Sequence, residues 1–440
     1  MRFRRLPPLA LLLSLFFPAS TASAQDGPGA QTSATAQATD SIALAHARLL
    51  LEEVPLVDGH NDLPWQIREK ADGDLDSLDI AESQPELHTD IPRLEEGEVG
   101  AEFFAAYVPV ELIADGATRF ALMQIDLIRR IVERYPDTFA FVTTADGIEQ
   151  AHADGRIAVL VGVEGGHAIE GSLDVLRGLY ELGARYMTLT HWKSHAWADA
   201  ATDEPLHQGL SPFGEEVVRE MNRLGMLVDL SHVSDSTMMD ALRISEAPVI
   251  FSHSSARALA GHVRNVPDPI LREVARNGGI VMVNFAPAFI SEEARLHSER
   301  ADTVIDSLQT VFEDDSVGGR EAFQRWLEEN PPPKATLSQV ADHVDHIVEV
   351  AGIDHVGLGS DYDGIEEVPV GLEDVSTFPG LVAELLRRGY SDEDIRKLAG
   401  LNFLRVMREA EAVAARLSVE HAPYVDTISP EIDGEKGGSR

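Results

Sequence analysis

The run Val57-Asp58-Gly59-His60-Asn61-Asp62 places an imidazole and a carboxylate two positions apart, at the end of an apolar segment. Side chains of these two types bind divalent cations. The spacing alone identifies nothing, because His-x-Asp occurs four times, with further copies at His88 and Asp90, His152 and Asp154, and His343 and Asp345. Only the first copy ends a buried apolar run, so position selects His60 and Asp62 as candidate metal ligands.

Five more side chains of metal-binding type follow apolar runs in the same way: Glu164, His191, His232, His253 and Asp361. The carboxyl ends of parallel strands meet at one edge of a sheet or barrel, so these residues should converge there. The chain has no Cys, which restricts the donors to nitrogen and oxygen and favours zinc, manganese or cobalt over thiolate sites.

Two neighbouring ions need a bridging anion, and Glu164 is our candidate because a carboxylate offers two oxygens. Two alternatives stay open. A carboxylated Lys193, just beyond the fourth expected strand, could bridge instead, and Glu164 could merely cap the helix expected from Ser172.

The elements that must position these residues are short runs rich in Val, Ile and Leu, separated by stretches with helical spacing. Eight such runs are expected as strands: Leu56 to His60, Glu102 to Val108, Ile157 to Glu164, Tyr186 to His191, Leu227 to His232, Pro248 to His253, Gly279 to Phe285, and His355 to Asp361. This alternation predicts an α/β fold, a (β/α)8 TIM barrel. A doubly wound open sheet is the alternative, although no G-x-G-x-x-G follows the first run.

The two ends of the chain differ from its middle. Arg2, Arg4 and Arg5, an apolar stretch and Ala22-Ser23-Ala24 predict a cleavable signal peptide over 1–24, and thus an exported, periplasmic or extracellular protein. We expect a flexible linker over 25–40, the catalytic barrel over 41–420 with an insertion at about 287–335, and a polar tail over 421–440. The apolar stretch is too short to span a bilayer, so no membrane anchor is expected after cleavage.

The composition is strongly acidic, with 74 Asp and Glu against 36 Lys and Arg and a formal net charge of -38. Such a charge repels phosphate backbones, which argues against nucleic acid as a partner. A chain of 440 residues without Cys must be stabilised by a large core rather than by disulfides.

Several segments together resemble the membrane dipeptidase (renal dipeptidase) family, peptidase family M19. They follow one another in order from about residue 50 to 410: Val57-Asp-Gly-His-Asn-Asp62, Gly162-Val-Glu-Gly-Gly166, Tyr186-Met-Thr-Leu-Thr-His191, Val228-Asp-Leu-Ser-His232, Phe251-Ser-His-Ser-Ser-Ala-Arg257, Arg264-Asn-Val-Pro-Asp268, Gly357-Leu-Gly-Ser-Asp-Tyr-Asp-Gly364 and Gly400-Leu-Asn-Phe-Leu-Arg405. The resemblance implies a barrel hydrolase with two zinc ions, one held by His60, Asp62 and Glu164 and the other by Glu164, His232 and His253.

The resemblance also implies that His191 contacts the substrate carbonyl region, that Arg264 holds the free carboxylate of a dipeptide, and that Asp361 lies beside a metal-bridging water. A hydroxide formed there would attack the peptide carbonyl, His191 would stabilise the oxyanion, and Asp361 would carry the proton to the departing amine. A zinc-dependent dipeptidase, active also on C-terminal D-residues, and a homodimer are the expectations that follow.

The stretch Trp192 to Ala200 keeps a Trp-Ala-Asp core but lacks Asn residues typical of the family, which leaves side-chain preference open. Two other functions stay in view. One is a barrel hydrolase of another amide, such as an N-acyl amino acid or a lactam, and the other is a metal-binding protein without catalysis. The acidic insertion at 287–335 is expected to form a lid or an oligomer contact.

Overall fold

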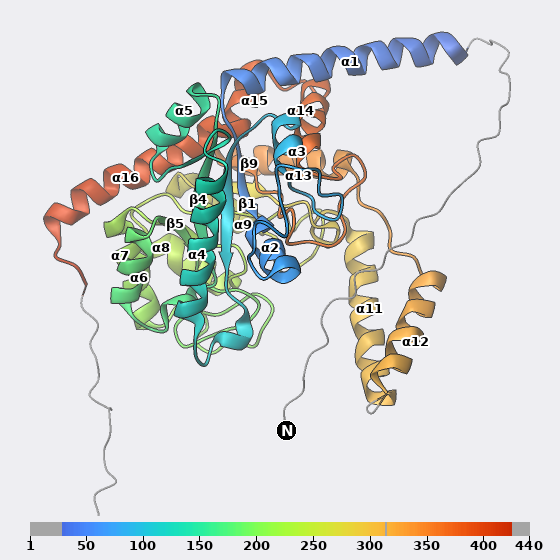
Figure 1. Cartoon of the computed structure of the whole chain (residues 1–440). Helices are drawn as coiled ribbons and strands as arrows, with labels where there is room; N and C mark the ends of the chain where they lie inside the picture. Colours follow the sequence, from blue (N-terminus) through green and yellow to red (C-terminus); the bar gives the residue numbers. More distant parts are fainter. Residues whose placement is uncertain (1–28, 313–314, 425–440) are drawn as a thin grey trace, which may run out of the picture. The chain divides into compact units, whose positions relative to one another are not determined.

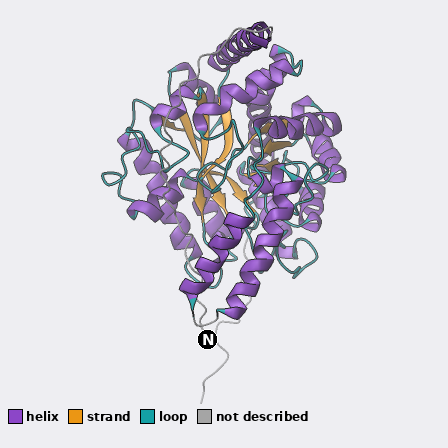
Figure 2. Cartoon of the chain, turned by 90° about the vertical axis from the view of Figure 1, so that its right-hand side faces the viewer, coloured by secondary structure: helices purple, strands orange, loops and turns teal. Residues whose placement is uncertain are grey.

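The computed structural model describes residues 29–312 and 315–424, and a closed barrel of parallel strands lies at its centre (Figure 2). Neighbouring strands pair in the order β2-β1-β9-β8-β7-β6-β5-β4, and β2 also pairs with β4, which closes the ring. The eight strands are β1 (Leu56–Asn61), β2 (Val99–Tyr107), β4 (Ile157–Glu164), β5 (Ala184–Thr188), β6 (Leu227–Asp229), β7 (Ile250–Phe251), β8 (Ile280–Val283) and β9 (Val356–Leu358). The predicted (β/α)8 barrel is therefore confirmed and the open sheet is not.

All eight expected runs contain a strand, and the bounds of β4 agree at both ends. Several expected strands were too long at the carboxyl end. His191, His232, His253 and Asp361 lie two or three residues beyond the last paired residue of β5, β6, β7 and β9, respectively. A further short strand, β3 (Phe139–Phe141), was not predicted; it pairs with the first residues of β4, outside the closed ring.

Helices fill the connections and surround the strands (Figure 1). Serine or threonine side chains cap several of them, among them Ser172, Ser211, Ser234 and Thr336. The helices between the strands are α2 (Leu63–Ala71), α3 (Ile91–Glu96), α4 (Ala117–Arg134), α5 (Ala145–Ala153), α6 (Leu173–Glu181), α7 (Pro212–Leu224), α8 (Asp235–Ile244), α9 (Asp268–Asn277) and α13 (Leu337–Ala351). After β9 follow α14 (Phe378–Arg387), α15 (Asp392–Arg396) and α16 (Asn402–Glu420).

The core has two layers, and successive residues of a strand enter different layers because side chains alternate across it. On β2, Phe103 joins the barrel interior, where it lies near Tyr186 and Phe403. Its neighbour Phe104 instead joins the larger layer between strands and helices. Tyr186 thus stands inside the barrel with its phenol pointing to the edge that carries the candidate site.

The expected linker at 25–40 needs correction, because the helix α1 (Gly29–Glu53) already begins at Gly29. Its first turns contain four alanines, at positions 30, 34, 36 and 38, and alanine is the best helix former. The barrel unit itself begins at Ala43. The expected signal peptide and residues 425–440 of the expected tail lie outside the described residues. Within the described ranges, no helix has the length and apolar character required to cross a membrane.

The insertion expected at about 287–335 is helical. It contains α10 (Pro287–Ile290), α11 (Glu292–Val311) and α12 (Ser316–Glu329), and the last two lie side by side (Figure 1). Few side chains of α11 are buried; Ala294 and His297 are, and the His297 ring packs on Trp326 of α12.

His343 of α13 ties two loops at the carboxyl edge of the barrel. Its Nδ1 accepts a hydrogen bond from the backbone N–H of Ala256, at 3.0 Å, and its Nε2 lies 2.9 Å from the carbonyl oxygen of Ile290. Both contacts are made only by the neutral ring with its proton on Nε2. Burial lowers the pKa of His343 to about 4.

This low pKa predicts a pH-dependent stability. The unfolded chain, with a histidine pKa near 6.5, binds the proton more tightly than the folded protein does. The free energy of unfolding should be largest above pH 6.5. It should fall by up to about 1.4 kcal/mol per pH unit for this residue as the pH decreases toward 4.

His343→Gln should be less stable at pH 7 but lose less stability between pH 6.5 and 4.5. Urea unfolding of metal-free protein at several pH values measures both slopes. Equal slopes in the two proteins would show that folding does not lower the pKa of His343.

Candidate metal centre

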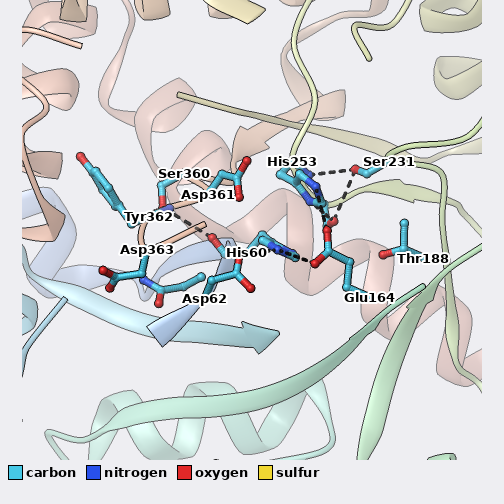
Figure 3. A network of polar contacts seen from close by, with 12 residues as sticks. His60, Asp62, Glu164, Thr188, Ser231, His253, Ser360, Asp361, Tyr362 and Asp363 are labelled. Carbon is cyan, nitrogen blue, oxygen red and sulfur yellow. Dashed lines mark hydrogen bonds and ion pairs between the residues drawn. The ribbon is translucent and has the colours of Figure 1, made fainter. Parts of the chain in front are cut away.

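The seven residues selected at strand ends lie together at the carboxyl edge of the barrel, and all but Asp361 are more than nine-tenths buried. Figure 3 shows the carboxylate of Glu164 between the rings of His60 and His253. The ring centroids of His60 and His253 are 3.9 Å apart, and those of His191 and His232 are 4.4 Å apart. Residues separated by up to about 300 positions in the sequence thus form one cluster, as the strand pattern predicted.

The two oxygens of Glu164 face different imidazoles. Its Oε2 lies 3.7 Å from Nε2 of His60, whereas its Oε1 lies 3.0 Å from Nε2 of His232 and 3.5 Å from Nε2 of His253. Each oxygen therefore has its own set of nitrogen atoms, which is the arrangement needed in a carboxylate that bridges two cations.

Asp62 and Asp361 extend the cluster on the side of His60. Oδ2 of Asp62 lies 3.1 Å from Nε2 of His60, and one oxygen of Asp361 lies within 4.8 Å of ligand atoms of both. The side chain of Asp361 also accepts a hydrogen bond at its Oδ2 from Asn284 Nδ2, at 2.8 Å.

The backbone is unusual at two of these positions. His232 has φ 70° and Asp361 has φ 66°, both in the left-handed region, which costs free energy for a residue with a side chain. Each residue lies three positions after the last residue of its strand, so this turn of the backbone directs its side chain toward the centre of the barrel edge.

The electrostatics favour a bound cation. Burial lowers the pKa values of His191, His232 and His253 far below the usual range, so these rings are neutral and carry free lone pairs. Burial raises the pKa of Glu164, which shows that its negative charge is poorly compensated when no cation is present. Burial likewise raises the pKa of Asp361, to about 6.

Neutral imidazoles and carboxylates fit a divalent ion. Three groups of potential ligands lie within 4.8 Å of one another: His60, Glu164 and His253; Glu164, His191 and His232; and His60, Asp62 and Asp361. Nitrogen and oxygen donors without thiols suit zinc, manganese or cobalt.

Arg264 was chosen from the resemblance alone, and its position differs from that of an ordinary loop arginine. Its side chain is 1 % exposed, and its guanidinium lies over the rings of Trp192 and Phe289, at 5.9 and 5.3 Å. No carboxylate within the described ranges lies within ion-pair distance of it, and its Nε has no hydrogen-bond partner there. A buried, unpaired guanidinium beside a metal-type cluster is a ready site for an anionic group.

His191 lies between aromatic side chains. Its ring makes edge contacts with Tyr107 and Trp192, at 4.9 and 5.3 Å, and its Nε2 lies 3.7 Å from Oε1 of Glu164. Tyr107 ends β2, and Trp192 is 41 % exposed, so both border the opening of the cluster.

The two alternatives for the bridge are not supported by the geometry. Lys193 is 43 % exposed at its side chain and forms an ion pair with Asp203 at 2.9 Å, outside the cluster. The helix that Glu164 could have capped is α6, and its cap is Ser172, which accepts from the N–H of Val175. The other His-x-Asp pairs do not enter the cluster either, and His343 has the structural role described above.

Sequence reasoning missed the residues that hold the ligands in place. Asn284, which follows β8, is an amide, a side chain that gives no zinc-ligand signal in a sequence. Tyr186, Asp229 and Ser252 were also missed, although they lie inside runs that were already singled out, and they hydrogen bond to His60, to Ser252 and to His253, respectively. Their position next to candidate ligands was the available signal.

Comparison with known proteins gives a consistent result. The family model of the membrane dipeptidases, peptidase family M19, matches residues 44–421. The dipeptidase verJ of Clonostachys rogersoniana is 40 % identical over 404 residues, which cover 89 % of this chain and 94 % of that protein.

Solved structures agree in fold. The probable dipeptidase PvdM of Pseudomonas aeruginosa superposes with a TM-score of 0.73 at 24 % identity, over 85 % of this chain and all of that one. A metallopeptidase of Rhodobacter sphaeroides, solved with a phosphinate mimic of the dipeptide L-Ala-D-Ala, superposes with a TM-score of 0.67 at 26 % identity, over 81 % and 99 % of the two chains. The chain therefore belongs to the membrane dipeptidase family, the M19 metallopeptidases, and is a dipeptidase.

Proposed function

We propose that this dipeptidase works with two zinc ions, one held by His60, Asp62 and Glu164 and the other by Glu164, His232 and His253. The observation that supports this most is the division of the Glu164 oxygens between separate imidazoles. Such a pair of ions would lower the pKa of water and polarise the peptide carbonyl.

Two residues of the chain would act beside the ions. Asp361 is held by Asn284 with one oxygen left toward the cluster, and a carboxyl group with a pKa near 6 can both take up and release a proton at neutral pH. We assign it the transfer of a proton to the departing amine. His191 is neutral and still offers one N–H, which would stabilise the negative oxygen that develops on the attacked carbonyl.

Arg264 would select the substrate. Its planar fork matches a carboxylate, and burial between Trp192 and Phe289 strengthens the interaction because water cannot screen it. A carboxylate held this close to the ions restricts cleavage to the bond just before the last residue, hence to dipeptides. The ligand of the Rhodobacter sphaeroides relative mimics L-Ala-D-Ala, which supports our proposal that C-terminal D-residues are accepted.

The sequence of residues 1–24 supports export, and we propose that the mature enzyme acts outside the cytoplasm on small peptides. The resemblance to the family supports a homodimer.

The bridging role of Glu164 predicts a loss of both ions in Glu164→Gln, because an amide cannot bind two cations through two oxygens. Glu102→Gln is a matched control on the neighbouring strand β2. Glu102 is fully buried, its oxygens have no hydrogen-bond partner among the described residues, and burial raises its pKa well above the usual range, so the amide replaces a neutral acid.

Zinc content after dialysis, measured by atomic emission, should be two per chain in the wild type and in Glu102→Gln, and below one in Glu164→Gln. Retention of two ions in Glu164→Gln would contradict the bridge.

The substrate role of Arg264 predicts that Arg264→Ala keeps two ions but loses kcat/KM on dipeptides by roughly 30- to 1,000-fold, since a buried charge pair is truncated. Arg264→Lys should recover part of this loss. Dipeptide amides, which lack the carboxylate, should be cleaved equally slowly by all three proteins. An equal loss on dipeptides and on their amides would show that Arg264 does not bind the carboxylate.

The proton-carrier role of Asp361 predicts that Asp361→Asn binds both ions with unchanged affinity and loses kcat by about 10²- to 10⁴-fold. Metal titration and steady-state kinetics on the same preparation separate the two effects. A parallel loss of zinc and of rate would identify Asp361 as a ligand instead, a role that its position near His60 and Asp62 would allow.

A further inference from the structure

The rings of His60 and His253 are both held from behind by hydroxyl groups. Nδ1 of His60 lies 2.8 Å from the phenol oxygen of Tyr186, and Nδ1 of His253 lies 2.8 Å from Oγ of Ser252. The Tyr186 phenol also lies close enough to the Ser252 hydroxyl for the two groups to interact. All four side chains are buried. The contacts made by the Nδ1 atoms of the two histidines therefore lead to one residue, Ser252.

Ser252 in turn donates a hydrogen bond to the carboxylate of Asp229, the last residue of β6. Its Oδ2 accepts from Oγ of Ser252 at 2.7 Å and from Oγ1 of Thr188 at 2.5 Å. Its Oδ1 accepts from the N–H groups of Ser252 and Ser231, at 2.8 and 3.1 Å. Four donors fill the four lone pairs that a carboxylate offers.

The direction of each hydrogen bond follows from counting protons. Ser252 has one hydroxyl proton, and its contact with Asp229, at 2.7 Å, is shorter than its contact with Ser231, at 3.4 Å. With that proton given to Asp229, its two lone pairs accept from His253 and from Tyr186. Tyr186 gives its proton to Ser252 and must therefore accept from His60. When cations occupy the centre, both imidazoles then carry their proton on Nδ1 and a lone pair on Nε2, the atom that faces Glu164.

We propose that Tyr186, Ser252 and Asp229 are positioning residues that fix the tautomers of His60 and His253 together and so couple the two ion sites. We call these three residues the hydroxyl network. This inference rests on the proposed two-ion centre and adds to it that the sites share one anchoring carboxylate. Such outer partners commonly raise metal affinity by 10- to 100-fold.

The barrel makes room for the network. A Cβ on Gly162 would lie 2.0 Å from Cζ of Tyr186, and a Cβ on Gly59 or Gly359 would lie 2.4 or 1.8 Å from the carbonyl oxygen of Ser252. These three positions lie on β4, β1 and just after β9. No side chain larger than hydrogen fits at any of them while Tyr186 and Ser252 keep their places.

A second clamp of the same kind provides a control. Ser360 donates to Asp58 through its N–H, at 2.7 Å, and through its Oγ, at 2.5 Å, just as Ser252 does to Asp229. Ser360 also directly precedes a site residue, Asp361, but its hydroxyl touches no imidazole nitrogen. Ser360→Ala therefore removes an equivalent clamp without freeing a histidine ring.

The test measures zinc affinity by competition with a chelator in wild type, Ser252→Ala, Tyr186→Phe and Ser360→Ala. We expect Ser252→Ala to weaken both ions by 10- to 100-fold, Tyr186→Phe to weaken mainly one, and Ser360→Ala to change either by less than about threefold. The coupling would be overturned if Ser252→Ala and Ser360→Ala lost zinc affinity to the same extent. It would also be overturned if Ser252→Ala weakened the binding of only one ion.

Nuclear magnetic resonance gives a second readout on zinc-loaded protein. The wild type should show two exchange-protected imidazole Nδ1–H signals from His60 and His253, and Tyr186→Phe should lose the first and keep the second. Retention of both Nδ1–H signals in Tyr186→Phe would overturn the proposed hydroxyl network, and this test does not depend on whether Ser252→Ala folds. A wild type that binds fewer than two zinc ions would instead contradict the proposed function, so the two failures can be told apart.

Discussion

The burial of the Glu164 carboxylate among four imidazoles is the constraint on which the rest of the site depends. A buried carboxylate is costly unless a positive charge compensates it, and here its neighbours His191, His232 and His253 are neutral. Although burial alone would lower it, the nearby Glu164 and Asp62 raise the pKa of His60 to about 10, so without a metal this ring compensates the charge only as a cation that cannot be a ligand. The same burial that keeps the other three rings neutral leaves their lone pairs available. Only bound cations would both compensate the charge of Glu164 and use the lone pairs of the imidazoles. Metal binding should therefore be linked to folding of the barrel edge.

The barrel supplies the rigidity that this constraint requires. Each candidate ligand is held close to the end of a strand whose other face is packed in the core, so the positions of Glu164 and His60 follow from strand pairing rather than from loop conformation. The carboxylate of Asp229 then locks the ends of β6 and β7 together through Ser252. Precise placement of ligands by such outer contacts is what a catalytic metal site needs.

Much of this could be predicted from the sequence, for a physical reason. The alternation of apolar runs with helical stretches determines a parallel barrel, and parallel strands bring their carboxyl ends to one edge, so His60, Glu164 and His253 could be grouped without coordinates. The strand lengths could not be predicted, because His191 and His232 leave the sheet to turn inward, and the left-handed φ of His232 has no signal in residue type. The burial of Arg264 was also hidden, since it depends on Trp192 and Phe289 from distant segments.

The anchoring residues were the hardest to foresee. Tyr186 and Ser252 are residues of common types, and their roles appear only when β1 and the neighbouring strands β5, β6 and β7 are assembled in one barrel. The helical start of residues 29–40, in contrast, was missed although alanine content indicated it.

The most direct test of a two-ion centre bridged by Glu164 is anomalous diffraction at the zinc edge from crystals of the zinc-loaded protein. The account predicts two peaks roughly 3.5 to 4 Å apart, one on each side of the Glu164 carboxylate. A single peak, or a second peak away from Glu164, would contradict it.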